Sequence, residues 1–294
     1  MNVTYTDMNY ARQFIKPRDP DTHKGQCGRV LIVAGSEGMC GAAALSAKAA
    51  LRSGSGLVTV ALDEKLFPIV QVLVPEATCV PRSRIMAKDG DSFLSRFDSI
   101  VIGPGIGVSE ENYQMIYRIM QETECIKVID ADGLNTLCSY DNKLSCMTAY
   151  PGKVVITPHP GEADRLLKCA GASTVREMGR ENAVRALADF TRATVLLKGN
   201  ETLVAKSGHD VSCNTTGNPG MATGGSGDVL TGVIASLCGI GYNGYAAARI
   251  GAFIHGLAGD IAAEHLGQWG MTSMDIVSFL PLAFKAAAEK QNPY

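Results

Sequence analysis

The chain has 294 residues, of which 46% are hydrophobic and 19% charged, and its formal net charge is −2. This length and composition support a full core without disulfides, and the interspersed charges leave no basic stripe for nucleic acid. The nine cysteines show no ligand-like spacing, which argues against structural zinc and favours a reducing cytoplasm. There is no long apolar run, and the N-terminal residues carry charges and prolines where a signal peptide would be apolar, so no membrane segment is predicted.

Short β-branched runs alternate with helical patterns along the chain. The expected strands are 29–34, 57–61, 99–102, 127–130, 154–157 and 194–198, and the helices expected between them are 41–52, 110–122, 161–168 and 173–190. A polar-tipped hairpin at the sheet's edge is expected from 202–205 and 210–213, followed by three closing helices at 228–237, 245–266 and 273–290. This order predicts a three-layer, doubly wound α/β fold with a mostly parallel sheet, in a single domain spanning 1–294.

Glycine-rich and polar clusters follow five of the expected strands. They are the loop at 35–38, GPGIG at 103–107, DADGLN at 130–135, TPHPGE at 157–162 and KGNET at 198–202. The carboxyl ends of parallel strands meet at one edge of a sheet, and such sheets bind ligands there. The sequence therefore predicts one broad cleft at that edge.

The segment NPGMATGGSGDVLTG at 218–232 sets a glycine-rich turn and one carboxylate in front of an apolar helical stretch. Its glycines allow conformations closed to other residues, so the amides of residues 225–228 can converge on an anion at the positive end of the helix dipole. Phosphate suits such a site, and Asp228 is then placed to take a proton from a hydroxyl that attacks the phosphorus. The alternative is a tight turn in which Asp228 caps the helix.

Several common motifs are absent or incomplete. GPGIG lacks the final glycine of a dinucleotide fingerprint and carries Pro104, which favours a loop that a ligand approaches closely over a Rossmann phosphate site. No GxxxxGK[ST] sequence occurs, which argues against a P-loop enzyme. Ser226 lies in GGSGD and not in GxSxG, so a serine hydrolase is not favoured.

Polar residues at the predicted cleft each have two open interpretations. His159, between two prolines, either faces the cleft or is a packed or solvated loop residue. Glu162 either caps the following helix or holds a hydrated magnesium ion against phosphates. Lys198 either meets a nucleotide phosphate or is a solvated strand end. Asp132 either caps a helix or joins Asp130 in contacting a ligand or metal.

Seven sequence blocks together resemble the ADP-dependent NAD(P)H-hydrate dehydratases, members of the ribokinase-like superfamily. They are KGQCGRVLIVAGS, GAAALSAKAALRSGSGLVTV, VIGPGIG, VIDADGLN, VITPHPGEADRL, LLKGNET and NPGMATGGSGDVLTG, in this order from residue 24. The resemblance implies a ribokinase-like fold and a lyase that repairs nicotinamide cofactors. ADP would phosphorylate the S epimer of NADH hydrate or NADPH hydrate, and loss of phosphate would restore NAD(P)H and leave AMP.

The resemblance also implies roles for individual residues. Asp228 would be the catalytic base and contact the substrate, and Glu162 would hold Mg²⁺. Ala43, Gly107 and His159 would line the pocket for the hydrated dinucleotide. The nucleotide would be bound by Lys198, Gly199, Asn200, Glu201, Thr202, Gly225, Ser226 and Gly227. This chain has HPGE at 159–162 where superfamily kinases usually have Asn-x-x-Glu, which favours the dehydratase and leaves the metal-organising role of Asn without a counterpart.

Two other functions remain open. A ribokinase-like kinase of a small vitamin-precursor alcohol would share the fold and the GSGD turn, and would leave a stable phosphorylated product. A non-catalytic nucleotide sensor would need the amides but not Asp228. For the dehydratase, the resemblance implies a homotetramer, ADP as the phosphoryl donor, and a stand-alone domain that depends on a separate NAD(P)H-hydrate epimerase, with no nucleic acid or membrane partner.

Overall fold

The computed structural model describes residues 3–289, which contain one ten-stranded sheet. The strands are β1 (Val3–Thr6), β2 (Arg29–Val33), β3 (Leu57–Leu62), β4 (Thr78–Pro81), β5 (Ser99–Ile102), β6 (Ile126–Ile129), β7 (Val154–Ile156), β8 (Thr194–Leu197), β9 (Leu203–Ala205) and β10 (Val211–Asn214). They lie in the order β1-β10-β9-β8-β7-β6-β5-β2-β3-β4. β9 is antiparallel to both of its neighbours, and the other neighbouring pairs are parallel.

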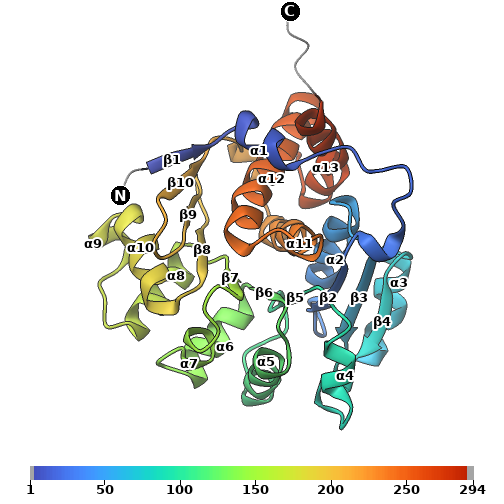
Figure 1. Ribbon diagram of the computed structural model, residues 1–294, viewed down its shortest axis with the longest axis vertical. Coiled ribbons are helices and arrows are strands. Elements are labelled where there is room, and N and C mark those ends of the chain that lie inside the picture. The colour runs from blue at the N-terminus through green and yellow to red at the C-terminus, as the bar shows by residue number, and fades with distance from the viewer. Residues whose placement is uncertain (1–2, 290–294) are drawn as a thin grey trace, which may run out of the picture.

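Helices cover both faces of the sheet (Figure 1). The α-helices are α1 (Met8–Phe14), α2 (Cys40–Arg52), α3 (Phe67–Leu73), α4 (Gly90–Leu94), α5 (Glu110–Glu122), α6 (Asp132–Tyr140), α7 (Ser145–Thr148), α8 (Pro160–Cys169), α9 (Val175–Met178), α10 (Arg180–Thr191), α11 (Ser226–Gly239), α12 (Gly244–Leu266) and α13 (Ser273–Ala288). Short 3₁₀ helices are η1 (Lys24–Gln26), η2 (Glu64–Leu66), η3 (Arg82–Met86) and η4 (Pro219–Met221). Helices α1–α3 and α11–α13 pack on one face and α4–α10 on the other.

The sheet separates two apolar cores, and β2 shows how. Val30 and Ile32 point into the core beneath α2 and α11, whereas Leu31 and Val33 point into the core beneath α4–α10. All four side chains are fully buried. A strand buried on both faces is apolar throughout, which is why the continuous β-branched runs predict its position. The expected three-layer α/β architecture with a mostly parallel sheet is confirmed.

The hairpin of β9 and β10 does not form the edge of the sheet, contrary to the prediction. β1 pairs in parallel with β10 and takes the outer position. Thr6 Oγ1 lies 2.6 Å from Ser212 Oγ, and Arg249 Nε donates to Thr6 Oγ1 at 3.0 Å. These partners are more than 200 residues apart, so the short β1 segment has no local signal. β4, at the opposite edge, was also not predicted.

The helix expected at 173–190 is interrupted. Gly179 has φ +78°, a left-handed conformation that ends α9 and lets α10 begin at Arg180. The helix expected to end at Lys290 is α13, which ends at Ala288. Lys290 itself lies outside the described residues.

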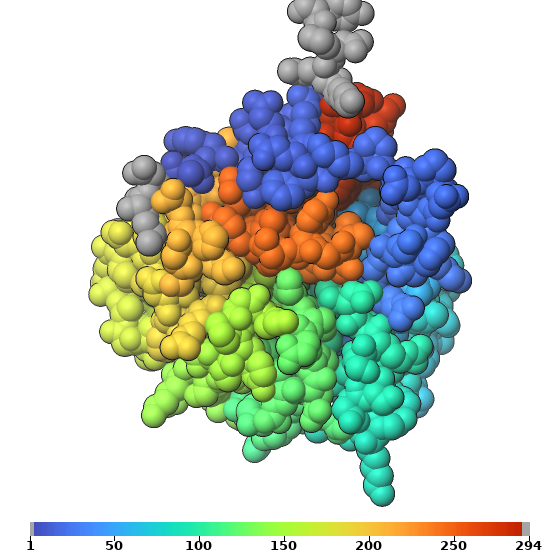
Figure 2. All heavy atoms as spheres, in the orientation of Figure 1, coloured from blue at the N-terminus to red at the C-terminus, as the bar shows by residue number. Residues whose placement is uncertain are grey.

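The N-terminal segment crosses the molecule over the C-terminal helices (Figure 2). Tyr242 Oη donates to Phe14 O at 2.7 Å, and the Arg249 guanidinium lies 3.6 Å from the centroid of the Tyr10 ring. These contacts fix the segment to α12 and the loop before it. Within residues 3–289, no helix combines the length and hydropathy that crossing a membrane requires.

The predicted polar loops meet at the carboxyl edge of the sheet. β2 and β5 are neighbours, and the chain runs outward from β2 to β4 on one side and from β5 to β8 on the other. This reversal is where doubly wound sheets bind ligands. The loops after these two strands are joined there, because Gly35 N donates to Pro104 O and Ser36 Oγ donates to Gly105 O, both at 2.8 Å.

Candidate active site

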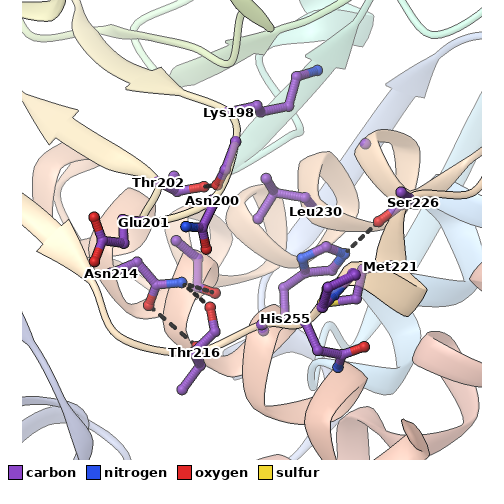
Figure 3. Close-up of a pocket in the computed structure, with 18 residues that line it drawn as sticks. Lys198, Asn200, Glu201, Thr202, Asn214, Thr216, Met221, Ser226, Leu230 and His255 are labelled. Carbon is purple, nitrogen blue, oxygen red and sulfur yellow. Dashed lines mark hydrogen bonds between the residues drawn. The ribbon is translucent and has the colours of Figure 1, made fainter. Parts of the chain in front are cut away.

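A cavity of about 490 Å³ opens beside the N-terminus of α11 (Figure 3). The turn after β8, the loop after β10, α11 and α12 all contribute to its lining. Among the lining residues are seven predicted to bind the nucleotide: Lys198, Gly199, Asn200, Glu201, Thr202, Ser226 and Gly227. The eighth, Gly225, packs against α2 and α13, where a Cβ would lie 2.4 Å from Leu45 Cδ1 and 2.9 Å from Ser273 Oγ.

Part of the cavity wall has its hydrogen bonds satisfied within the protein. Asn214 Nδ2 donates to Thr216 O at 2.9 Å and to Ala252 O at 3.3 Å, and its Oδ1 accepts from Thr216 Oγ1 at 3.2 Å. Met221 and Leu230 add apolar surface (Figure 3). A wall of this kind suits a flat, largely apolar group such as a nucleobase better than a charged one.

The N-terminus of α11 presents unpaired amides. Gly225 caps the helix with φ +86°, a conformation that favours glycine. The Ser226 amide donates to Thr223 O at 3.3 Å, so it is not one of the free donors that the sequence predicted. Within the described part of the chain, the amides of Gly225, Gly227 and Asp228 have no acceptor. Three N–H groups at the positive end of a helix are therefore available to an anion.

Asp228 is the third residue of α11 and does not cap it. The cap is Gly225, and no side chain accepts a hydrogen bond in its place. The pKa of Asp228 is raised to about 7, chiefly by burial and in smaller part by the nearby carboxylates of Asp130 and Asp132, whereas the ammonium group of Lys198 lowers it. A carboxylate with a pKa near neutrality can accept a proton far more effectively than an ordinary aspartate.

A partly buried ion pair lies beside this aspartate. Lys198 Nζ donates to Asp130 Oδ1 at 2.8 Å, and Asp130 Oδ2 accepts from Thr231 Oγ1 at 2.9 Å. Glu162 Oε2 is 3.9 Å from the same Nζ. Burial lowers the pKa of Lys198, but these carboxylates outweigh it and the net shift is upward. A Cβ on Gly227 would lie 3.3 Å from Nζ, so the ammonium group sits at the amide end of α11.

The residues predicted to hold the hydrated dinucleotide lie outside this cavity. Ala43 is fully buried, and a Cβ on Gly35 would lie 3.0 Å from the Ala43 methyl group. The Ala43 methyl therefore supports the loop after β2 from below.

Gly107 has φ +79°, and the space that a Cβ on it would occupy is open. Its amide donates to Asp132 Oδ2 at 2.9 Å, and its carbonyl accepts from Asn112 Nδ2 at 3.0 Å. Asp132 therefore fixes the GPGIG loop and does not cap α6.

His159 and Glu162 form a capping box at the start of α8. His159 Nδ1 accepts from Gly161 N at 3.0 Å, and Glu162 Oε2 accepts from His159 N at 2.9 Å. His159 Nε2 is 3.5 Å from Glu162 Oε1, and about half of the imidazole side chain is exposed. One edge of the His159 ring therefore caps the helix and the remaining surface is open to solvent, as expected of a solvated loop histidine, and its contact with the substrate stays a prediction.

The donor set around Glu162 fits only a hydrated metal ion. Glu162 is 4% exposed, its Oε2 is occupied by the cap, and Oε1 faces His159. No group of three or more His, Cys, Asp or Glu residues suited to a metal occurs within 3–289. Magnesium commonly keeps several waters and binds through substrate phosphates, so Glu162 could serve it through water.

Two polar residues of α12 near this cavity were not among the residues predicted from the sequence. His255 lines the cavity with Nε2 3.4 Å from Ser226 Oγ, and burial lowers the pKa of its imidazole to about 4 (Figure 3). Asp260 accepts from Gly217 N and from Asn218 Nδ2, both at 2.9 Å, and so fixes the loop that forms the cavity wall. Their signal was available, because a polar residue within a core helix needs a partner.

Comparison with known proteins assigns the family. The family model for NAD(P)H-hydrate dehydratase matches residues 30–282. The chain belongs to this family. It is similar to the ADP-dependent (S)-NAD(P)H-hydrate dehydratase of Neisseria meningitidis, with 38% identity over 256 residues, covering 86% of this chain and 83% of the relative. It also matches the bifunctional NAD(P)H-hydrate repair enzyme Nnr of Moorella thermoacetica, with 38% identity over 289 residues, covering 96% of this chain and 54% of that protein.

Solved structures place the family fold in the ribokinase-like superfamily. A ribokinase-like superfamily protein from Enterococcus faecalis superposes with a TM-score of 0.86 and 28% identity, over 98% of this chain and 97% of its own. The ADP/ATP-dependent NAD(P)H-hydrate dehydratase of Bacillus subtilis, co-crystallized with ATP/Mg2+, gives a TM-score of 0.82 and 27% identity, covering 98% and 99%. The ribokinase-like fold implied by the sequence blocks is confirmed. The chain spans about half the length of the bifunctional relatives it matches.

Proposed function

We propose that this protein uses ADP to dehydrate the S epimer of NADH hydrate or NADPH hydrate to the reduced cofactor, releasing AMP and phosphate. The observation that carries the proposal is Asp228. Its carboxylate, with a pKa raised to about 7, lies at the amide end of α11 next to a cavity lined by the predicted nucleotide residues. Membership of the family supports the choice of substrate.

The chemistry divides into two steps. Asp228 takes the proton of the ring hydroxyl, whose oxygen attacks the terminal phosphorus of ADP, and the bond from that phosphorus to the AMP oxygen breaks. The phosphorylated ring then loses phosphate as its C–O bond breaks, and a proton leaves the neighbouring ring carbon to restore the double bond. Hydroxide is a poor leaving group and phosphate a good one, so the first step makes the second possible.

The amides of Gly225, Gly227 and Asp228 are placed to stabilise the phosphoryl group as it transfers, and Lys198 adds positive charge at the same helix end. Such preorganised donors are worth about 3 to 4 kcal/mol each in comparable oxyanion sites. Residues 198–202 would hold the AMP part. Gly107, after β5, and His159, after β7, would face the hydrated dinucleotide, and the buried Ala43 would support that wall from beneath the loop after β2.

Magnesium, when bound with the nucleotide, would neutralise phosphate charge. Glu162 is the residue proposed to meet it, through water, because its Oε2 is engaged by the helix cap. The Bacillus subtilis relative was co-crystallized with ATP/Mg2+, which supports a nucleotide accompanied by the ion.

The remaining assignments are proposals about the whole protein. We place it in the cytoplasm, as a single domain over 1–294 that assembles into a homotetramer and acts with a separate epimerase. All nine cysteines are free, which supports a reducing compartment. The similarity over 83% of the Neisseria meningitidis dehydratase supports activity without a fused partner domain.

The test is to mix the protein with S-NADH hydrate, ADP and magnesium and follow both the reduced-nicotinamide absorbance and the nucleotide products. One AMP and one phosphate are expected for each NADH restored. The R epimer should react only when an epimerase is added. Repair without nucleotide consumption, or accumulation of a stable phosphorylated product as expected of a small-alcohol kinase, would contradict the proposal.

A further inference from the structure

The turn at 199–202, which lines the nucleotide cavity, is held from outside by a residue that no sequence motif singles out. Arg180, the first residue of α10, donates through one guanidinium nitrogen to Asn200 O and through another, at 3.1 Å, to Glu201 O. Thr202 Oγ1 donates to Gly199 O at 2.9 Å (Figure 3). Three consecutive carbonyls of the turn are therefore fixed by side chains.

Fixing these carbonyls also aims the amides of the turn. The C=O and N–H of a trans peptide unit point in opposite directions, so each bound carbonyl turns the next amide to the other side. The amides of Asn200, Glu201 and Thr202 have no acceptor within residues 3–289. Successive unpaired N–H groups in a turn form a concavity that binds negatively charged or strongly accepting oxygens.

The conformation of this turn needs outside support. Glu201 has φ +52°, which is uncommon for a residue with a side chain, and Gly199 has φ +142°. Arg180 bonds the carbonyls on both sides of the Glu201 Cα. A Cβ on Gly199 would lie 3.2 Å from Arg180 Nη2, so the guanidinium packs closely behind the turn.

Helix stability does not explain an arginine at this place. A cation at the N-terminus of a helix opposes the helix dipole and is mildly destabilising. Arg180 is the first residue of α10 because Gly179, with its positive φ, separates α10 from α9. This places the start of α10 next to the 199–202 turn. The guanidinium fork matches two carbonyls at once, which an ammonium group cannot do with the same geometry.

We propose that Arg180 is a positioning residue for the nucleotide: it holds the 199–202 turn so that three backbone amides face the acceptor oxygens of the bound nucleoside diphosphate. It does so without touching the ligand. This inference rests on the proposed use of ADP by the same cavity, and it assigns to a side chain outside that cavity a role in nucleotide affinity and none in the chemical step.

The experiment compares Arg180→Ala, Arg180→Lys and the control Arg176→Ala, which removes an exposed arginine from neighbouring α9. ADP affinity is measured by calorimetry, and KM for ADP, KM for the hydrate and kcat by steady-state kinetics. We expect Arg180→Ala to lower the affinity for ADP roughly 10- to 100-fold, and to leave kcat at saturating ADP and KM for the hydrate unchanged. Arg180→Lys should recover part of the affinity, and Arg176→Ala should match the wild type.

Two results would overturn the inference. One is ADP affinity within twofold of the wild type in folded Arg180→Ala. The other is an equal loss in KM for ADP and KM for the hydrate, which would indicate a general structural role. If the alanine variant does not fold, Arg180→Lys decides, because wild-type ADP affinity in that variant rules out a requirement for the fork. Wild-type protein that binds no ADP refutes the proposed function instead.

Discussion

Replacing Asp228 with Asn should make the protein more stable at alkaline pH while it loses activity. The folded state raises the pKa of this carboxyl from 3.8 to about 7, chiefly through burial. A shift of about three units corresponds to ~4 kcal/mol at ~1.36 kcal/mol per unit, and solvent in the cleft screens part of it, so we take about half, ~2 kcal/mol.

The sign follows from which state binds the proton. Because the folded pKa is raised, the protonated form favours folding below pH 3.8, and this advantage is lost as the pH rises through about 7. The neutral amide of Asp228→Asn avoids the loss. The variant should therefore exceed the wild type by about 2 kcal/mol in unfolding free energy at pH 8.5, and by only about 1 kcal/mol at pH 5.

Turnover should fall in the same variant, because Asn cannot accept the proton of the attacking hydroxyl. General-base catalysis contributes about 10²- to 10⁴-fold, so the phosphoryl-transfer step should slow by at least about a hundredfold. ADP affinity should stay similar or rise, since a repelling charge is gone. Denaturant unfolding at the two pH values, calorimetry with ADP and single-turnover kinetics measure the three quantities. Turnover close to the wild-type rate would refute Asp228 as the base.

Three further predictions concern the same cleft. His159→Ala should weaken binding of the hydrated dinucleotide roughly 5- to 150-fold and leave ADP affinity unchanged. His159→Asn keeps a capping acceptor, so it should show the same loss of substrate affinity with wild-type thermal stability. Equal losses of affinity for both ligands would contradict the assignment of His159 to the substrate. The rate of the chemical step should rise with pH around a midpoint near 7 as Asp228 ionises, and a flat profile from pH 5.5 to 8.5 would count against it. Burial lowers the pKa of His255 from 6.5 to about 4. Protonation of this imidazole should therefore cost the wild type about 3 kcal/mol of unfolding free energy, relative to His255→Gln, as the pH falls through this interval; parallel pH–stability curves for the two proteins would disprove a buried neutral imidazole.

The sequence predicts the centre of the fold better than its edges. β5 matches its predicted range, 99–102, because all four of its residues are buried and its apolar run is continuous. β1 and β4 are short, lie at the two edges and depend on partners in distant parts of the chain. A pattern within one segment cannot reveal such pairing, as Thr6 and its contacts with Ser212 and Arg249 illustrate.

The candidate site was likewise predictable only where the signal lies within one short segment of the sequence. Glycines and polar residues at strand ends predicted the turn at 198–202 and the N-terminus of α11, which meet at the cavity. His255 lines the cavity but lies in a largely apolar helix, and Arg180, for which we propose a positioning role, begins a helix whose separate start the sequence does not predict. Ala43 came from the resemblance alone, and its side chain proves to be buried beneath Gly35.

The most direct measurement follows the oxygen of the substrate's ring hydroxyl. S-NADH hydrate carrying ¹⁸O at that hydroxyl is converted with unlabelled ADP, and the released phosphate is analysed by mass spectrometry. If the hydroxyl oxygen attacks phosphorus and then leaves with it, each phosphate carries one ¹⁸O. Unlabelled phosphate with ¹⁸O in water would mean that the C–O bond breaks without phosphorylation, and would contradict the account.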